Sequence, residues 1–169
     1  DNQTETFDEV IMATHADTSM AIIINPDEEE LETLKAFPYG ENEGCLHTDT
    51  ETLPKNKGAW ASWNYNLDQE PNKPMTMTYN MNMLQTLDAN DTYCVTLNNN
   101  DLVDDEKVLK KLHYEHPQFT PKGIGAQKRK HEISGVNNTY YCGAYWNNGF
   151  HEDGVLSALE VCSHFGIEL

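Results

Sequence analysis

The stretch TYYCGAYWNNGFHEDGVLSALEVCSHFG, residues 139–166, predicts a strand, a glycine loop and a helix in that order. Residues 139–144 are aromatic or small and apolar, which is typical of a strand. Residues 147–154 contain two glycines and form the loop. Residues 155–165 have apolar side chains at helical spacing, and Gly166 closes the helix.

This order of elements makes a polar pocket from backbone alone. The first N–H groups of a helix have no partner inside it, and the helix dipole is positive there. Gly149 and Gly154 allow the main chain to approach a flat or anionic group closely. The same pattern also occurs in a plain turn, so the aromatic residues around the loop matter. They are Tyr140, Tyr141, Tyr145, Trp146 and Phe150.

Outside this stretch, five further segments have the alternation or the β-rich composition of strands. They are residues 7–14 (a buried strand), 44–48, 59–65, 76–83 and 92–97. One helix is predicted to start at Pro26 with Asn25 as its cap, and another spans residues 104–113. The predicted fold class is therefore α+β, with a mixed, largely antiparallel sheet and a few helices.

The charge and composition exclude several classes of partner. The chain has 28 acidic and 11 basic residues, for a formal net charge of -17. That sign argues against binding nucleic acid or an anionic membrane surface. The longest apolar run, residues 20–24, is too short to span a membrane. The four cysteines are widely spaced, which favours free thiols in a reducing, cytoplasmic location.

Two further groups of residues are candidates for a functional site, one for a metal site and the other for an apolar pocket. His113 and His116 lie three apart at the end of the second predicted helix, but no complete ligand set is evident, so no metal site is predicted. Trp60, Trp63 and Tyr65 alternate along one predicted strand. They either line an apolar substrate pocket or belong to the core.

Four stretches resemble the FAD-dependent amine-oxidase-like family, and in particular a bacterial group described as predicted NAD/FAD-binding proteins. The resemblance covers nearly the whole chain in the family's order. The stretches are FDEVIMATHAD (residues 7–17), LHTDTETLPKNKGAWASWNY (46–65), TYNMNMLQTL with YCVTLN (78–98), and YYCGAYWNNGFHEDGVLSAL (140–159).

The resemblance implies that the two strand ends and the helix start contact FAD. The residues that it assigns to the cofactor are Ala13, Thr14, Gly143, Ala144, Tyr145, Glu152, Asp153, Gly154 and Val155. Free amides at Gly154 and Val155 would stabilise negative charge on reduced flavin. For Glu152 and Asp153, simple helix capping is an equally open role.

The sequence departs from the family because it has no GxGxxG turn after a strand. We therefore expect a C-terminal fragment whose partner is a missing N-terminal FAD-binding domain. Its expected segments are 1–17 (a strand returning to that domain), 18–135 (the substrate side) and 136–169 (the FAD-contacting strand, loop and helix).

Two functions follow as expectations. The first is oxidation of a small organic substrate, apolar or lipid-linked, by hydride transfer to flavin in the complete protein. The second is a non-catalytic binding module that presents an aromatic, apolar pocket. The sequence assigns no catalytic residue to either function.

Overall fold

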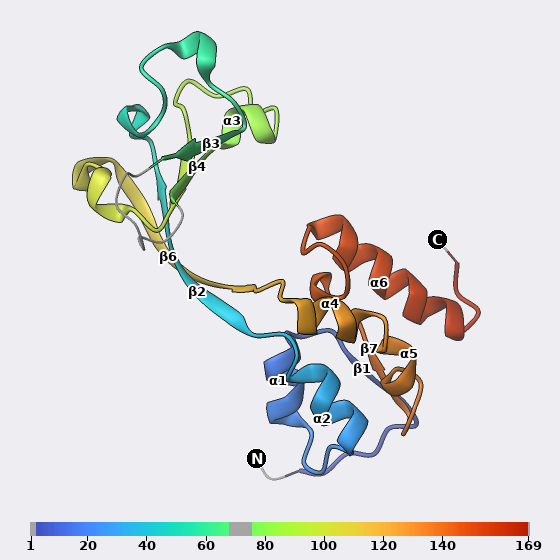
Figure 1. Ribbon diagram of the computed structural model, residues 1–169. Coiled ribbons are helices and arrows are strands. Elements are labelled where there is room, and N and C mark those ends of the chain that lie inside the picture. Colours follow the sequence, from blue (N-terminus) through green and yellow to red (C-terminus); the bar gives the residue numbers. More distant parts are fainter. Residues whose placement is uncertain (1–2, 68–75, 169) are drawn as a thin grey trace. The chain divides into compact units, whose positions relative to one another are not determined.

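The computed structural model describes residues 3–67 and 76–168, which form two units (Figure 1). Unit 1 consists of Asp1–Gly40 together with His116–Leu169, and unit 2 is the intervening segment Glu41–Glu115. Residues 18–40 and 116–135, which the sequence analysis grouped with the substrate side, lie in unit 1. Its two segments meet where the Gln118 amide donates a 2.8 Å hydrogen bond to the Pro38 carbonyl.

Unit 1 contains a pair of parallel strands, β1 (Val10–Met12) and β7 (Thr139–Tyr141), which lie side by side (Figure 1). Val10 pairs with Thr139 and Met12 with Tyr141. Both strands were predicted, but each is only three residues long. The prediction that β1 is buried is wrong, because the side chains of Val10 and Ile11 are 40% and 50% exposed.

The helices described in unit 1 are α1 (Ala16–Ile22), α2 (Glu28–Leu34), α4 (Pro121–Gln127), α5 (Lys130–Ile133) and α6 (His151–His164). The cap of α2 is Asp27 rather than the predicted Asn25. Its carboxylate accepts the Glu30 amide at 2.8 Å while the Glu30 carboxylate accepts the Asp27 amide at 3.0 Å, which is a capping box. None of the helices in the described ranges is long and apolar enough to cross a membrane.

The core of unit 1 is aromatic. Phe37 packs edge-on against Tyr145 and Trp146, with ring centroids 5.0 and 5.2 Å apart. Leu34, Ile133 and other buried side chains complete this cluster beneath the helices. Such aromatic pairs stabilise a core beyond the area that they bury.

Unit 2 is built on a five-stranded sheet of order β3-β4-β5-β2-β6. The strands are β2 (Tyr39–His47), β3 (Trp63–Asn66), β4 (Thr76–Asn80), β5 (Cys94–Leu97) and β6 (Val108–Pro117), and the short helix α3 (Met81–Leu84) follows β4. The β3–β4, β4–β5 and β2–β5 pairs are antiparallel. The fold is therefore α+β with a largely antiparallel sheet, as predicted.

The helix predicted over residues 104–113 is wrong. A single 3-10 turn at Asp105–Lys107 leads instead into the strand β6. The spacing of Val108, Leu109 and Leu112 also fits a helix, but the neighbour of β6 in the sheet is β2, which lies far away in the sequence. Long-range pairing of this kind overrides local helical spacing.

The two faces of this sheet differ in an unusual way. Residues opposite one another on antiparallel strands share a face. His47, Thr78 and Thr96 share one face, and all three are fully buried although they are polar. The other face carries Trp63, which is exposed, and Tyr79, which is half-buried.

Candidate functional site

The residues that the sequence analysis assigned to FAD meet at one edge of the β1–β7 pair. Because the strands are parallel, their carboxyl ends lie at the same edge, and the Cys142 amide continues the pairing with a 3.0 Å bond to the Met12 carbonyl. Ala13 and Thr14 directly follow β1. Gly143 and Ala144 come shortly after β7, so the structure brings four of the predicted residues together.

The start of α6 lies against the same edge. A Cβ placed on Gly154 would lie 3.8 Å from the Ala144 nitrogen. The Gly143 amide donates a 2.7 Å bond to the Ser157 hydroxyl, which in turn donates to the Gly154 carbonyl at 3.0 Å. Ser157 thereby fixes the first turns of α6 to the end of β7.

Helix α6 begins four residues earlier than predicted, and this changes which amides are free. The Gly154 amide donates to the Phe150 carbonyl at 3.2 Å, so the prediction of an unpaired amide there is wrong. Val155 lies one residue further into the helix, where the i−4 carbonyl is its acceptor. The amides without a partner inside the helix are those of the first three residues, His151 to Asp153.

The two acidic residues at the start of α6 have different surroundings. The Asp153 carboxylate accepts the Phe150 amide at 2.9 Å and the Asn148 amide at 3.2 Å. Asp153 therefore acts as a cap that folds the loop back onto the helix. Glu152 is exposed beside it. Of the two open roles, the structure supports capping for Asp153.

Tyr145 and Gly143 serve the packing of unit 1. The side chain of Tyr145 is only 3% exposed, and a Cβ on Gly143 would lie 2.5 Å from its ring. The ring thus fills the space over Gly143. Burial raises the pKa of the Tyr145 phenol.

One part of this edge is therefore more accessible than the other. Ala13 and Val155 are exposed, and Thr14, Ala144 and Gly154 are half-buried. Added atoms at Gly154 would meet only ordinary contacts with Ala144. The accessible surface runs from the end of β1 to the start of α6, and it offers amide donors and a glycine.

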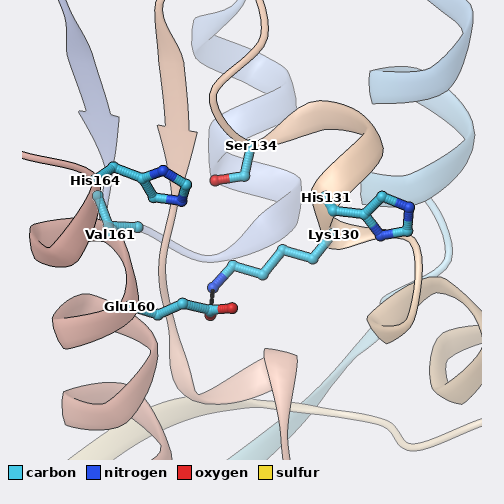
Figure 2. Close-up of a pocket in the computed structure, with 6 residues that line it drawn as sticks. All are labelled: Lys130, His131, Ser134, Glu160, Val161 and His164. Carbon is cyan, nitrogen blue, oxygen red and sulfur yellow. Dashed lines mark hydrogen bonds and ion pairs between the residues drawn. The ribbon is translucent and has the colours of Figure 1, made fainter.

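A separate cavity of about 180 Å³ lies between α5 and α6 (Figure 2). Lys130 reaches across it to form an ion pair with Glu160, and its ammonium lies 5.7 Å from the centre of the Trp146 ring. Figure 2 shows His164 and Ser134 directed into the same space, whereas His131 points away. This volume is below the range of about 300–1,000 Å³ that holds drug-sized ligands, and Glu160 already neutralises the lysine.

The aromatic residues of unit 2 do not form a buried core. Trp63 and Tyr65 are 51% and 53% exposed, and Tyr79 lies edge-on to Trp63 with centroids 6.3 Å apart. Trp60 precedes the strand and donates its indole N–H to the Pro54 carbonyl at 2.8 Å. Of the two open interpretations, this exposure argues against the core for Trp63 and Tyr65.

One group of potential metal ligands was missed in the sequence. Glu41, His113 and Glu115 bring their ligand atoms within 4.8 Å of one another. Because residues 104–113 were predicted as a helix, the sequence analysis considered His113 together with His116 and did not consider Glu41. No local signal marks Glu41, because it comes from another strand.

Comparison with known proteins adds no relative to this description. No protein-family model matches the chain, and no curated protein matches it. Any function has to be inferred from the geometry of these surfaces.

Proposed function

We propose that unit 1 is the closing part of an FAD-binding fold, and that the complete protein is an amine-oxidase-like, FAD-dependent oxidoreductase. The observation that supports this proposal is the parallel β1–β7 pair with the start of α6 at its carboxyl edge. In open parallel sheets, ligands bind outside the carboxyl ends of the strands. Residues separated by most of the chain meet at that edge, as the family resemblance requires.

The exposure of the pair also supports a larger sheet. Parallel strands are normally covered on both faces. Here Val10 and Ile11 of β1, and Val155 and Leu156 of α6, are each 40–50% exposed. In our proposal a dinucleotide-binding domain, which carries the GxGxxG turn, supplies the strands and the cover for these side chains.

The residues of this chain would bind and orient the cofactor. When bound, flavin supplies the acceptor for a hydride from the substrate. The amides at the start of α6 and the positive end of its dipole favour negative charge at that edge. Asp153 and Ser157 hold the loop and the helix in place, and no residue at this edge is assigned as a base.

Unit 2 would provide the substrate side. Its exposed aromatic face, which includes Trp63 and Tyr65, suits an apolar or lipid-linked organic molecule. The four cysteines are free thiols, which is compatible with the cytoplasmic location that we propose.

Spectroscopy of the purified protein tests this proposal. We expect the chain alone to bind added FAD weakly, and the complete protein with its dinucleotide-binding domain to be yellow. Gly154→Val places a bulky side chain beside Ala144 and should release the flavin. Ser163→Val, at the far end of α6, should retain it. A folded but colourless complete protein would refute the proposal.

The exposed aromatic face favours one other function, a non-catalytic binding module. In that case the chain alone binds an apolar ligand, and Trp63→Ser weakens this binding whether or not FAD is present. An isolated chain that binds no apolar ligand would exclude the module.

A further inference from the structure

The β2–β6 pair carries a group of side chains with the composition of a transition-metal site. Glu41 lies on β2, and His113 and Glu115 lie on β6. Their carboxylate oxygens and imidazole nitrogen lie within 4.8 Å of one another, and all three side chains are exposed. This arrangement does not depend on the flavin proposal, because all three residues belong to unit 2.

The strand geometry explains how the group forms. Side chains two apart on a strand point to the same face, so His113 and Glu115 are neighbours whereas His116 lies on the opposite face. Glu41 then approaches from the adjacent strand. Ligands that come from two hydrogen-bonded strands are held by the sheet rather than by a mobile loop.

The charges of the group are uncompensated. Two carboxylates that face each other across neighbouring strands repel. Within residues 3–67 and 76–168, no hydrogen bond or ion pair is formed by the side chains of Glu41, His113 or Glu115. The nearest lysine along the same face of β6, Lys111, lies 3.8 Å from Asp105 instead. The three side chains therefore have free donor atoms for a cation.

We infer that Glu41, His113 and Glu115 bind one divalent transition-metal ion, with Zn²⁺ as the reference ion. Zinc binds nitrogen and oxygen ligands at about 2.0–2.2 Å, so tetrahedral ligand atoms lie about 3.4 Å apart. Small rotations of three exposed side chains close the observed spacing to that value. An imidazole with two carboxylates favours Zn²⁺ over Mg²⁺, which prefers oxygen ligands and retains its waters.

Calorimetric titration of the full chain, stripped of metal with a chelator, tests the inference. We expect one Zn²⁺ per chain and no measurable binding of Mg²⁺ at the same concentrations. His113→Ala should weaken Zn²⁺ binding by more than about tenfold, and Glu41→Gln should also weaken it. The matched control is His116→Ala, which should bind Zn²⁺ like the unaltered chain.

Cobalt provides a second measurement that separates this site from the cysteines. Co²⁺ bound to nitrogen and oxygen lacks the intense thiolate charge-transfer bands that cysteine ligation produces. The site is supported if the unaltered chain binds Co²⁺ without thiolate bands and the His113→Ala variant does not bind Co²⁺. Three outcomes would overturn it: no stoichiometric binding, equal binding by His113→Ala, or thiolate bands with Co²⁺.

Discussion

The phenol of Tyr141 donates a 2.8 Å hydrogen bond to the carboxylate of Glu30, and both side chains are buried. Tyr141 ends β7, whereas Glu30 lies in the first turn of α2, so this bond joins the last strand of the chain to an early helix. Glu30 also accepts the Asp27 amide within its capping box. One buried carboxylate thus organises both a helix start and a contact between distant segments.

Replacing Tyr141 by phenylalanine tests the strength of this link. The ring remains, but a hydrogen bond to a buried carboxylate is lost, which we expect to lower the free energy of unfolding by about 1.5–3 kcal/mol. Urea denaturation measures the change, and hydrogen exchange of the β7 amides reports on unit 1 separately. Tyr140→Phe is the control and should change stability by less than about 0.5 kcal/mol. Equal effects of both substitutions would contradict the role of the bond.

The buried histidine of unit 2 predicts a loss of stability in acid. His47 accepts the Asp49 amide at 3.1 Å through Nδ1, so its Nε2–H donates to the Thr96 hydroxyl at 2.8 Å. Burial lowers the pKa of His47 below its usual value near 6.5, although Asp49 opposes this shift. At pH values between the lowered pKa and about 6.5, His47 binds more protons in the unfolded chain than in the folded chain. The free energy of unfolding therefore falls as the pH drops through this range.

Urea midpoints at several pH values between about 5 and 8 measure this dependence. His47→Gln keeps a hydrogen-bonding side chain but does not titrate, so its stability should change less over the window. His116→Gln, at an exposed position, should keep the slope of the unaltered chain. A slope that persists in His47→Gln would assign the dependence to other groups.

Asp49 is another buried ionisable group of unit 2. Burial alone would raise its pKa, but the Asp104 amide at 3.0 Å, the Lys107 ammonium at 2.9 Å and the Glu51 amide at 3.2 Å together lower it. The ionised form is thus favoured by folding. Its contribution is complete above the usual pKa near 3.8 and is lost as the pH falls toward the lowered value.

Asp49→Asn should destabilise the chain at neutral pH by about 1.5–3 kcal/mol. The neutral side-chain amide is a weaker acceptor than the carboxylate for the three donors around it, the Asp104 amide, the Glu51 amide and the Lys107 ammonium. Thermal or urea unfolding measures this loss. Asp105→Asn, whose side chain is 91% exposed in the unaltered chain, should be close to neutral. If the Asp49→Asn variant were as stable as the unaltered chain, the three hydrogen bonds would not favour the charged form.

Substitution of Gly154 tests whether packing within the chain requires glycine at this position. A Cβ there would make only ordinary contacts near Ala144, and alanine is the better helix former. We expect Gly154→Ala to stabilise the isolated chain by up to about 1 kcal/mol. The opposite is expected for Gly143→Ala, because its Cβ would collide with the Tyr145 ring. A destabilised Gly154→Ala chain would show that glycine is kept there for packing.

The sequence predicts the fold well where the signal is local. The alternation in residues 76–83 and the β-rich run 92–97 correctly indicated β4 and β5, although the first prediction ran too far, because residues 81–84 form α3. The proline and acidic residues after Asn25 correctly indicated a helix start. The cap is Asp27 instead, because its carboxylate and that of Glu30 accept each other's backbone amides and form the capping box.

The sequence fails where distant segments decide the structure. The local spacing of Val108, Leu109 and Leu112 indicates a helix. Their strand forms because it pairs with β2, which is distant in the sequence. The start of α6 was placed too late, because its first three residues, 151–153, are polar and give no apolar period. The candidate edge could be named from the family resemblance. The core role of Tyr145 and the approach of Glu41 to His113 required the tertiary structure.

The hydrogen bond between Gln118 and Pro38 means that the polypeptide leaves unit 1 and returns to it at a single place. Unit 2 is therefore an insertion in unit 1. If unit 2 were removed, a tight reverse turn could join the chain at Pro38 to the chain at Gln118. Recombination or a designed excision at that junction can exchange one module without rebuilding the pairing of β1 with β7. The two units could then diverge in sequence independently of each other.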